Sequence, residues 1–275
     1  MEFGIVEFLK VILIGIVEGI TEWLPISSTG HMLLVDAFWP LQMSEAFKEM
    51  FFVVIQLGAI LAVVVLFWKR MFPFQFRERP HVRQDIFSMW FRVIVAVLPA
   101  AVLGVLFDDW LEQNFGHPFS IALMLIVYGI AFILIENWNR FRTPKITDIA
   151  QIDYKTALII GLFQVLSMIP GTSRSGATII GALLLGVSRT AAAEFTFFLA
   201  VPTMLGASAL KLVKFGFGFT SAELIVLLVG MAVAFVVSLL AIRFLMNYVQ
   251  KHDFRIFGWY RIILGILVIL VFAIR

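Results

Sequence analysis

The sequence predicts an all-α polytopic integral membrane protein with six transmembrane helices plus two re-entrant helical hairpins in an inverted-topology repeat. Hydrophobic residues make up 61% of its 275 residues and charged residues only 14%, whereas soluble domains are roughly half apolar and a quarter charged. The apolar residues form segments of about the length that crosses a bilayer, and two polar motifs interrupt them half a chain apart. We expect a single membrane domain over residues 1–275.

Apolar segments follow one another along the chain, approximately at residues 4–24, 47–68, 91–107, 118–138, 156–169, 177–187, 193–213, 222–248 and 258–274. Most of them are long enough to cross a membrane. The first ends at Pro25, before a polar run and a short apolar piece at 32–39, and the fifth ends at Pro170, before a polar run and the sixth. Irregular backbone at membrane depth must be buried in protein or line a wet cavity, so we expect a re-entrant hairpin at both places.

The two hairpins resemble each other in sequence. An offset of 146 residues aligns Gly15 with Gly161, Glu18 with Gln164, Ser27 with Ser173, Thr29 with Ser175 and Gly30 with Gly176. A weak repeat of half the chain length is typical of membrane proteins that contain two related units. We therefore expect repeats at approximately residues 1–140 and 150–275.

Loop charges predict the orientation. The loops at 69–83 and 139–155 are basic, whereas the loop at 108–117 is acidic and holds no Lys or Arg. The basic residues are Lys69, Arg70, Arg77, Arg79, Arg83, Arg140, Arg142, Lys145 and Lys155, and the acidic ones are Asp108, Asp109 and Glu112. By the positive-inside rule the basic loops are cytoplasmic. Both termini are then outside, and the hairpins enter from opposite faces, so the repeat is inverted. Lys211 and Lys214, near an outer loop, disagree with this topology.

Composition excludes several classes of protein and site. The chain has no cysteine, which excludes disulfides, thiolate catalysis and cysteine metal sites. No block of Lys and Arg resembles a nucleic-acid patch, so we expect no nucleic-acid partner. The first residues, with Glu2, Glu7 and Lys10, lack the basic start and small-residue cleavage site of a signal peptide, and we expect the first apolar segment to stay in the protein.

The first polar motif, residues 18–31, has the groups that phosphate cleavage needs. Glu18 and Glu22 are four residues apart and share one helix face, and carboxylates near the bilayer interior face a cavity or a cation. The motif thus combines a hydroxyl nucleophile, an imidazole base and carboxylates that orient the base or bind a divalent cation. Its other polar members are Ser27, Ser28, Thr29 and His31.

The second motif, residues 170–176, has the groups of an anion clamp. Arg174 is always charged, and its planar fork of donors suits phosphate. Two hydroxyls and two glycines that let backbone amides approach a ligand surround it, at Ser173, Ser175, Gly171 and Gly176. Each motif leads into a helix N-terminus, where free amides and the helix dipole favour an anion. We expect the two motifs to form one site near the middle of the membrane.

Other readings stay open on these residues. Ser27 and Ser28 after a proline are often only helix caps, paired glutamates can form a proton relay, and Arg174 can be a structural partner of Glu22. Inverted repeats with broken helices also occur in carriers, so the alternative function is a membrane transporter or lipid flippase with an anion site at the repeat interface. A carrier needs the clamp, but not a hydroxyl, an imidazole and carboxylates around it.

The segment EGITEWLPISSTGH at 18–31 resembles the first signature of the undecaprenyl-diphosphate phosphatases of the BacA/UppP type, and PGTSRSGAT at 170–178 resembles the second. The resemblance implies hydrolysis of undecaprenyl diphosphate to undecaprenyl phosphate and inorganic phosphate, which recycles the carrier lipid for peptidoglycan synthesis. It also implies a divalent cation, Mg2+ or Ca2+, and a site among membrane lipids that faces the outer side of the bacterial cytoplasmic (inner) membrane. A homo-oligomer is compatible with it.

Within this resemblance we assign hypothetical roles. Ser28 attacks the terminal phosphorus with His31 as general base, Glu22 orients His31 or holds the metal, and Glu18 shares that role. Arg174 binds the transferred phosphoryl group and stabilises its transition state. The expected substrate-binding residues are Ser27, Thr29, Gly171, Ser173, Ser175 and Gly176. In the competing mechanism, metal-activated water attacks directly, with His31 or a glutamate as base.

Overall fold

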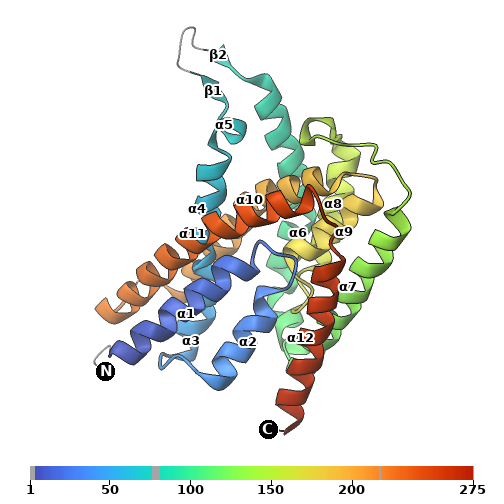
Figure 1. Cartoon of the computed structure of the whole chain (residues 1–275). Coiled ribbons are helices and arrows are strands. Elements are labelled where there is room, and N and C mark those ends of the chain that lie inside the picture. Colours follow the sequence, from blue (N-terminus) through green and yellow to red (C-terminus); the bar gives the residue numbers. More distant parts are fainter. Residues whose placement is uncertain (1–3, 76–80, 217, 275) are drawn as a thin grey trace.

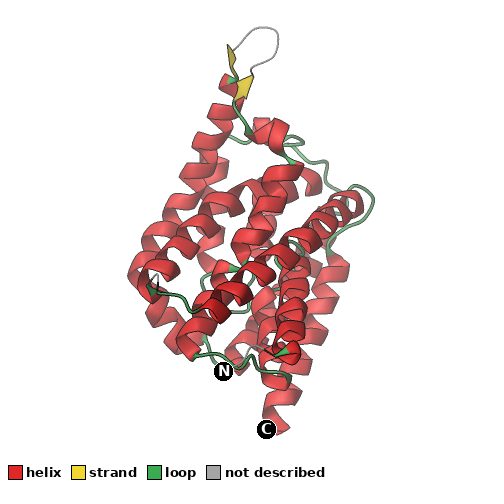
Figure 2. Ribbon diagram, turned by 90° about the vertical axis from the view of Figure 1, so that its left-hand side faces the viewer, coloured by secondary structure: helices red, strands yellow, loops and turns green. Residues whose placement is uncertain are grey.

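The computed structural model describes residues 4–75, 81–216 and 218–274, and helices dominate it (Figure 2). In chain order the elements are α1 (Ile5–Thr21), α2 (Ser28–Phe38), α3 (Glu45–Val54), α4 (Gln56–Leu66), α5 (Trp68–Met71), β1 (Phe74–Gln75), β2 (His81–Val82), α6 (Gln84–Phe115), α7 (Pro118–Asn139), the 3-10 helix η1 (Ile149–Gln151), α8 (Tyr154–Leu166), α9 (Arg174–Leu184), α10 (Arg189–Phe215), α11 (Ser221–Val249) and α12 (Arg255–Ile274). The fold class is confirmed; the small departure from it is the antiparallel pair β1–β2, two residues in each strand.

Six helical stretches in the described part of the chain are long and apolar enough to cross a membrane. They are Glu45–Leu66, Gln84–Phe107, Pro118–Asn139, Arg189–Phe215, Ser221–Val249 and Arg255–Ile274. This number is the one that the sequence predicts, and each stretch overlaps its expected segment. The chain is therefore a multi-pass membrane protein.

Two of these stretches differ in detail from the hydropathy pattern. The segment expected at 47–68 consists of two helices, α3 and α4, that meet at Ile55. Helix α6 begins at Gln84 and ends at Phe115, beyond both limits of the expected segment 91–107. Its added turns contain polar residues such as Asp85 and Asp109. Hydropathy locates the apolar centre of a helix, whereas hydrogen bonding continues into the polar turns at its ends.

The two expected hairpins are present as pairs of short helices, α1–α2 and α8–α9. In each pair the second helix begins after a serine with left-handed backbone, Ser27 at φ 72° and Ser173 at φ 71°, and these are the described non-glycine residues with positive φ. They occupy equivalent positions in the predicted sequence repeat. Helices α8 and α9, with 13 and 11 residues, are too short to cross about 30 Å of hydrocarbon at 1.5 Å per residue. Re-entry of the hairpins into a membrane stays a prediction.

The first helix of each hairpin packs closely on a long span through a matched glycine. Helix α1 lies along α11, and α8 lies along α6. A Cβ atom on Gly15 would come within 2.8 Å of a Val233 side-chain carbon, and one on Gly161 within 2.2 Å of the Ala96 carbonyl oxygen. Neither neighbour leaves room for a methyl group, so both hairpins sit on their spans by the same device.

The core concentrates around α10, which lies between the hairpins. Its residues from Ala191 to Val201 are all buried. Phe197 meets the ring of Trp23 edge-on at 5.3 Å between centroids, and Trp23 immediately precedes the break of the first hairpin. Aromatic pairs in this geometry add to the stabilisation from burial. This contact fixes where the chain leaves α1.

The two chain termini lie at one end of the molecule, and β1 and β2 lie at the other (Figure 1). This agrees with the predicted orientation, which puts the termini outside and the 69–83 loop inside. Lys214, which disagreed with the positive-inside rule, forms an ion pair with Asp109 at 2.9 Å. Arg77 and Arg79, and the side chains of Asp108 and Glu112, lie outside the described residues.

Candidate active site

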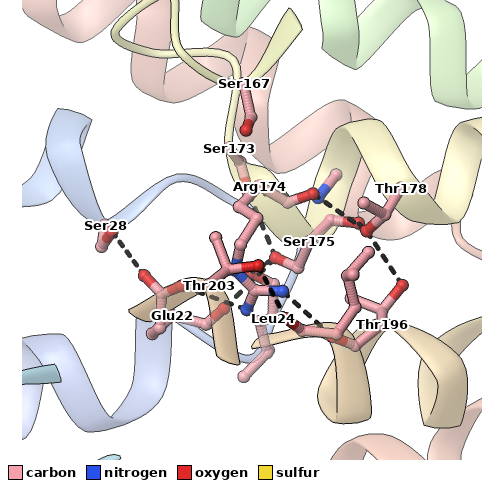
Figure 3. Close-up of polar contacts among 12 residues, drawn as sticks. Glu22, Leu24, Ser28, Ser167, Ser173, Arg174, Ser175, Thr178, Thr196 and Thr203 are labelled. Atoms are coloured by element: carbon pink, nitrogen blue, oxygen red, sulfur yellow. Dashed lines mark hydrogen bonds and ion pairs between the residues drawn. The ribbon is translucent and has the colours of Figure 1, made fainter. Parts of the chain in front are cut away.

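The breaks of the two hairpins lie against each other (Figure 3). The hydroxyl of Ser175, in the first turn of α9, donates to the backbone carbonyl oxygens of Glu22 at 3.2 Å and Leu24 at 3.4 Å. Arg174, which begins α9, reaches the Glu22 carboxylate. The sequence prediction that both motifs meet in one place is therefore matched by the geometry.

A line of polar contacts connects a hydroxyl, a carboxylate and a guanidinium. Ser28 Oγ donates to Glu22 Oε2 at 2.9 Å, and Arg174 Nη2 donates to Glu22 Oε1 at 3.2 Å. The other terminal nitrogen of Arg174 donates to the Thr196 carbonyl on α10 at 3.0 Å. The side chains of Glu22 and Arg174 are only 8% and 10% exposed. In such a poorly hydrated pair, loss of either charge leaves the other uncompensated.

Three buried polar atoms around this line have no hydrogen-bond partner among the described residues. They are Glu18 Oε1, Ser27 Oγ and Arg174 Nε; Trp23 Nε1, Gln164 Nε2 and Thr172 Oγ1, in the same two hairpins, also have no partner there. Glu18 is 1% exposed and lies within electrostatic range of Glu22 and Arg174. Buried polar groups in folded proteins are nearly always bonded. Two oxygens and one N–H donor that point to no protein partner form the kind of place that a ligand with phosphate oxygens, or a cation, completes.

His31 is held by two contacts that do not include Ser28. Its Nδ1 lies 2.7 Å from the Ser27 carbonyl oxygen, and its Nε2 lies 2.7 Å from the Tyr260 hydroxyl. A carbonyl can only accept, so Nδ1 carries the proton and Nε2 accepts from Tyr260. The Ser28 hydroxyl turns instead to Glu22. The predicted pairing of Ser28 with an imidazole base is thus replaced, in this geometry, by a pairing with a carboxylate.

Arg261 is a central residue of the site to which the sequence analysis gave no role. It is fully buried. Its guanidinium donates to carbonyl oxygens on both hairpin breaks, Pro25 at 3.3 Å and Gly171 and Thr172 at 2.8 Å each. Further contacts reach carbonyls of α7. Five fixed donors allow one arginine to bind several carbonyls at once, so Arg261 fixes the two breaks relative to each other.

The sequence contained a signal for Tyr260 and Arg261. They form a polar pair in the first turns of an otherwise apolar span, α12, and an arginine within a membrane segment is costly unless it has a function. The pair lies more than 80 residues from either motif. Only the folded chain therefore shows that both residues belong to the site.

The second motif is mostly occupied with its own structure. Ser173 Oγ accepts from the Gly176 amide at 3.2 Å and lies 3.1 Å from Ser175 Oγ. A Cβ on Gly171 (φ 91°) would lie 2.4 Å from the Ile121 carbonyl oxygen, and one on Gly176 would lie 3.2 Å from Arg261. These glycines and serines bring the break close to α7, α12 and the first hairpin. Their predicted contacts with substrate stay predictions.

The first motif is more open. Ser28 is half-buried and Thr29 is exposed, and no Ser27 side-chain hydrogen bond caps the start of α2. The first amides of that helix thus keep their attraction for an anion. Ser173, by contrast, caps α9 with its own hydroxyl.

The donor set suits a cation that also binds the substrate. No group of three or more His, Asp or Glu side chains that could hold a metal is found in the described part of the chain. Both oxygens of Glu22 already have partners, while Glu18 keeps a free, buried oxygen. Mg2+ commonly binds through one or two carboxylates plus substrate phosphates. Glu18, with Glu22 beside it, fits that pattern.

Comparison with known proteins gives a consistent result. A family model described as "Bacitracin resistance protein BacA" matches residues 11–267. An undecaprenyl-diphosphatase of Enterococcus faecalis is 69% identical over 276 residues and covers the full length of both chains. Proteins of the same name from Desulfitobacterium hafniense and Acetivibrio thermocellus are 62% identical over 273 residues and 58% identical over 270 residues, with at least 98% of each chain covered.

Proposed function

The chain belongs to the BacA family, and we propose that it is an undecaprenyl-diphosphate phosphatase, which hydrolyses undecaprenyl diphosphate to undecaprenyl phosphate and inorganic phosphate. The product is the carrier lipid of peptidoglycan synthesis. The named relatives are diphosphatases and give no support to the transporter reading.

The observation that carries this function is the contact of Ser28 with Glu22, and of Glu22 with Arg174. A hydroxyl that donates to a carboxylate is a nucleophile beside its base. An arginine on the other side of that carboxylate is a donor for the charge that develops on phosphate oxygens. A carrier needs the arginine, but has no use for the hydroxyl and its base.

In the first step we propose that Ser28 Oγ attacks the terminal phosphorus. The Oγ–P bond forms, the bond from phosphorus to the bridging oxygen breaks, and undecaprenyl phosphate leaves. Glu22 takes the hydroxyl proton, because its Oε2 is the atom to which Ser28 donates. Arg174 stabilises the phosphoryl oxygens through its free Nε–H, and the open start of α2 adds backbone amides.

In the second step water attacks the phosphoserine. The Oγ–P bond breaks, inorganic phosphate leaves, and the proton held by Glu22 returns to the Ser28 oxygen. We assign His31 as the base that takes the proton of the water. Its Nε2 becomes free to accept this proton when its hydrogen bond with the Tyr260 hydroxyl breaks. The competing mechanism omits the phosphoserine, with water as the direct nucleophile.

A divalent cation completes this proposal. Glu18, with Glu22, would hold Mg2+ or Ca2+ together with the diphosphate oxygens. When bound, such a cation neutralises charge on the diphosphate and on the leaving phosphate. Ser27 Oγ and Thr29, both at the start of α2, are the hydroxyls that we assign to the diphosphate.

For the location, we propose the bacterial cytoplasmic membrane with the site open to its outer side. The support is the loop charge pattern and the partly exposed face of α2, which follows the N-terminal helix. Addition of a membrane-impermeant diphosphate analogue to either side of sealed vesicles tests this. Inhibition only from the cytoplasmic side would contradict it. Assembly into a homo-oligomer stays a prediction.

The direct test is phosphate release from undecaprenyl diphosphate by the purified full-length protein in detergent, with Mg2+, with Ca2+ and with a chelator. We expect release that depends on a divalent cation. A phosphate-labelled substrate should also leave a phosphoserine on Ser28 after rapid acid quenching. Absence of release under all conditions would contradict the phosphatase function, and release without dependence on metal would remove the cation from Glu18.

A further inference from the structure

A second polar cavity lies at the other end of α9, away from the candidate active site. It has a volume of about 640 Å3, which is within the usual range of ligand pockets. Its walls are the end of α7, the chain after it, the link from α9 to α10 and the last turn of α11. Arg174, a residue of the candidate active site, begins α9, and the cavity adjoins the end of that helix, 10 residues later at Leu184, which is roughly 15 Å along the helix. We name this space the basic cavity.

Four cationic side chains line the basic cavity, and one carboxylate compensates only one of them. Glu136 binds Arg189 through both of its oxygens and also accepts from the Phe254 amide. Arg140, Arg142 and Lys145 have no carboxylate partner among the described residues. Three like charges around one hollow repel each other, and an anion between them removes that repulsion.

The cavity is built from fixed parts. The amides of Lys145 and Ile146 both donate to the Gly186 carbonyl, and the Ser188 amide donates to Ile146, so the two loops that form the walls are joined. Arg142 lies over the Trp138 ring, with its guanidinium carbon 3.6 Å from the ring centroid. Stacking holds the guanidinium in place and leaves its N–H edge free for a bidentate contact with phosphate.

The surroundings indicate that a lipid can reach this cavity. Phe141 is 90% exposed and Trp138 is 47% exposed, as is usual for aromatic residues at a membrane surface. The end of α7 and the link from α9 to α10, which line the cavity, lie toward the end of the molecule that carries β1 and β2, opposite the termini (Figure 1). Basic pockets between spans at the predicted cytoplasmic face are suited to lipid phosphates.

We propose that the basic cavity is a second anion site, which binds a phosphate group carried by an anionic lipid or present as free phosphate. This site is separate from the proposed hydrolysis and does not depend on it. The residues that decide binding are Arg140, Arg142 and Lys145.

The test compares two variants of equal charge. The cavity variant carries Arg140→Gln, Arg142→Gln and Lys145→Gln, and the control carries Lys69→Gln, Lys155→Gln and Lys251→Gln, three exposed cations that do not line the cavity. Native mass spectrometry measures retention of phosphatidylglycerol against phosphatidylcholine, and equilibrium dialysis measures labelled inorganic phosphate. Size exclusion and thermal unfolding verify that each variant folds, and Arg142→Gln alone serves if the triple does not.

We expect the wild type and the control to prefer phosphatidylglycerol by about tenfold or more, and the cavity variant to lose that preference. If the wild type shows no preference between the lipids but binds inorganic phosphate, and the cavity variant does not bind it, free phosphate is the ligand of the same site. Equal loss in both triple variants would show general surface attraction and overturn the proposal. Unchanged binding in the cavity variant would assign the anion to the site around Arg174 and overturn it as well.

Discussion

The two hairpins have the same backbone and different polar chemistry. Each second helix begins after a serine with φ near 70°, Ser27 in one and Ser173 in the other. In the second hairpin Ser173 caps its own helix and Ser175 bonds the opposite chain. In the first, Ser27 Oγ and Glu18 Oε1 have no protein partner. The second copy thus uses its serine hydroxyls within the protein and leaves Gln164 Nε2, Thr172 Oγ1 and Arg174 Nε without a partner, while the first leaves a serine and a carboxylate without one.

This difference indicates how a repeat can acquire catalysis. A left-handed serine is strained, and such strain persists only where the surroundings enforce it. Arg261 enforces it on both sides, since it binds carbonyls next to each break. With the backbone held, the residue after the serine could differ between the copies, as Ser28 in one and Arg174 in the other. The proposed nucleophile and the guanidinium beside it thus come from equivalent positions of the two copies.

The largest expected effect is on kcat, and it differs between the equivalent serine-containing breaks of the two copies. Ser28→Ala removes the proposed nucleophile and should reduce kcat by on the order of 10^3-fold or more. Ser173→Ala removes the cap of α9, at a stability cost of about 1 kcal/mol, and a hydroxyl expected to bind substrate, and should lower kcat far less than Ser28→Ala. Phosphate release with undecaprenyl diphosphate measures both. Turnover of Ser28→Ala close to wild type would favour direct attack by water.

The next effect concerns the cation of the second copy. Arg174→Lys keeps the charge but loses the fork that contacts Glu22 and Thr196 and that we propose binds the phosphoryl group. We expect a loss of roughly 10^2-fold in kcat, with a smaller change in KM. Arg243→Lys, at an exposed arginine of α11, is the matched control and should be neutral. An unimpaired Arg174→Lys enzyme would remove this residue from the reaction.

Substitution of Arg261 should destabilise the breaks of both hairpins at once. Arg261→Lys leaves several buried carbonyl oxygens without a donor, and we expect a loss of about 3 kcal/mol in stability. Thermal unfolding in detergent measures it, with Arg243→Lys again as control. If Arg261 positions the two hairpin breaks, the Arg261→Lys variant should also be less active than wild type at temperatures where it is still folded. Wild-type stability together with wild-type activity would show that the hairpins do not depend on this arginine.

The smallest expected effects are on stability, from the glycines at which the hairpins pack on their spans. Gly161→Ala places a methyl group against the Ala96 carbonyl and should cost about 2 to 3 kcal/mol. Gly15→Ala meets the Val233 Cβ at 2.8 Å and the Gly230 carbonyl oxygen at 3.0 Å, which is less close than the contact at Gly161, and should cost less. Gly206→Ala is the control, because nothing lies within 4 Å of its Cβ position; it should stabilise α10 by about 0.5 to 1 kcal/mol. Equal unfolding temperatures for all three would contradict the close packing of α8 on α6.

Much of this molecule was predictable because a bilayer imposes strong rules on sequence. Apolar segments of a given length must become helices, so the six spans follow from hydropathy. The breaks follow from Pro25 and Pro170 beside polar runs. The repeat was visible at an offset that the structure reproduces in Ser27 and Ser173. Charged residues in an apolar chain also had to meet, which is why Glu22 and Arg174 were expected in one site.

Local sequence by itself determined the spans, the breaks and the residue types at the site. Only the tertiary structure decided their partners: Ser28 bonds to Glu22, and His31 to Tyr260. It also decided that Arg261, far from both motifs, holds them together. The physical reason is that hydropathy and helix formation act over neighbouring residues, whereas a hydrogen bond depends on the relative position of two side chains to within about half an ångström. That position is set by the packing of all the helices together.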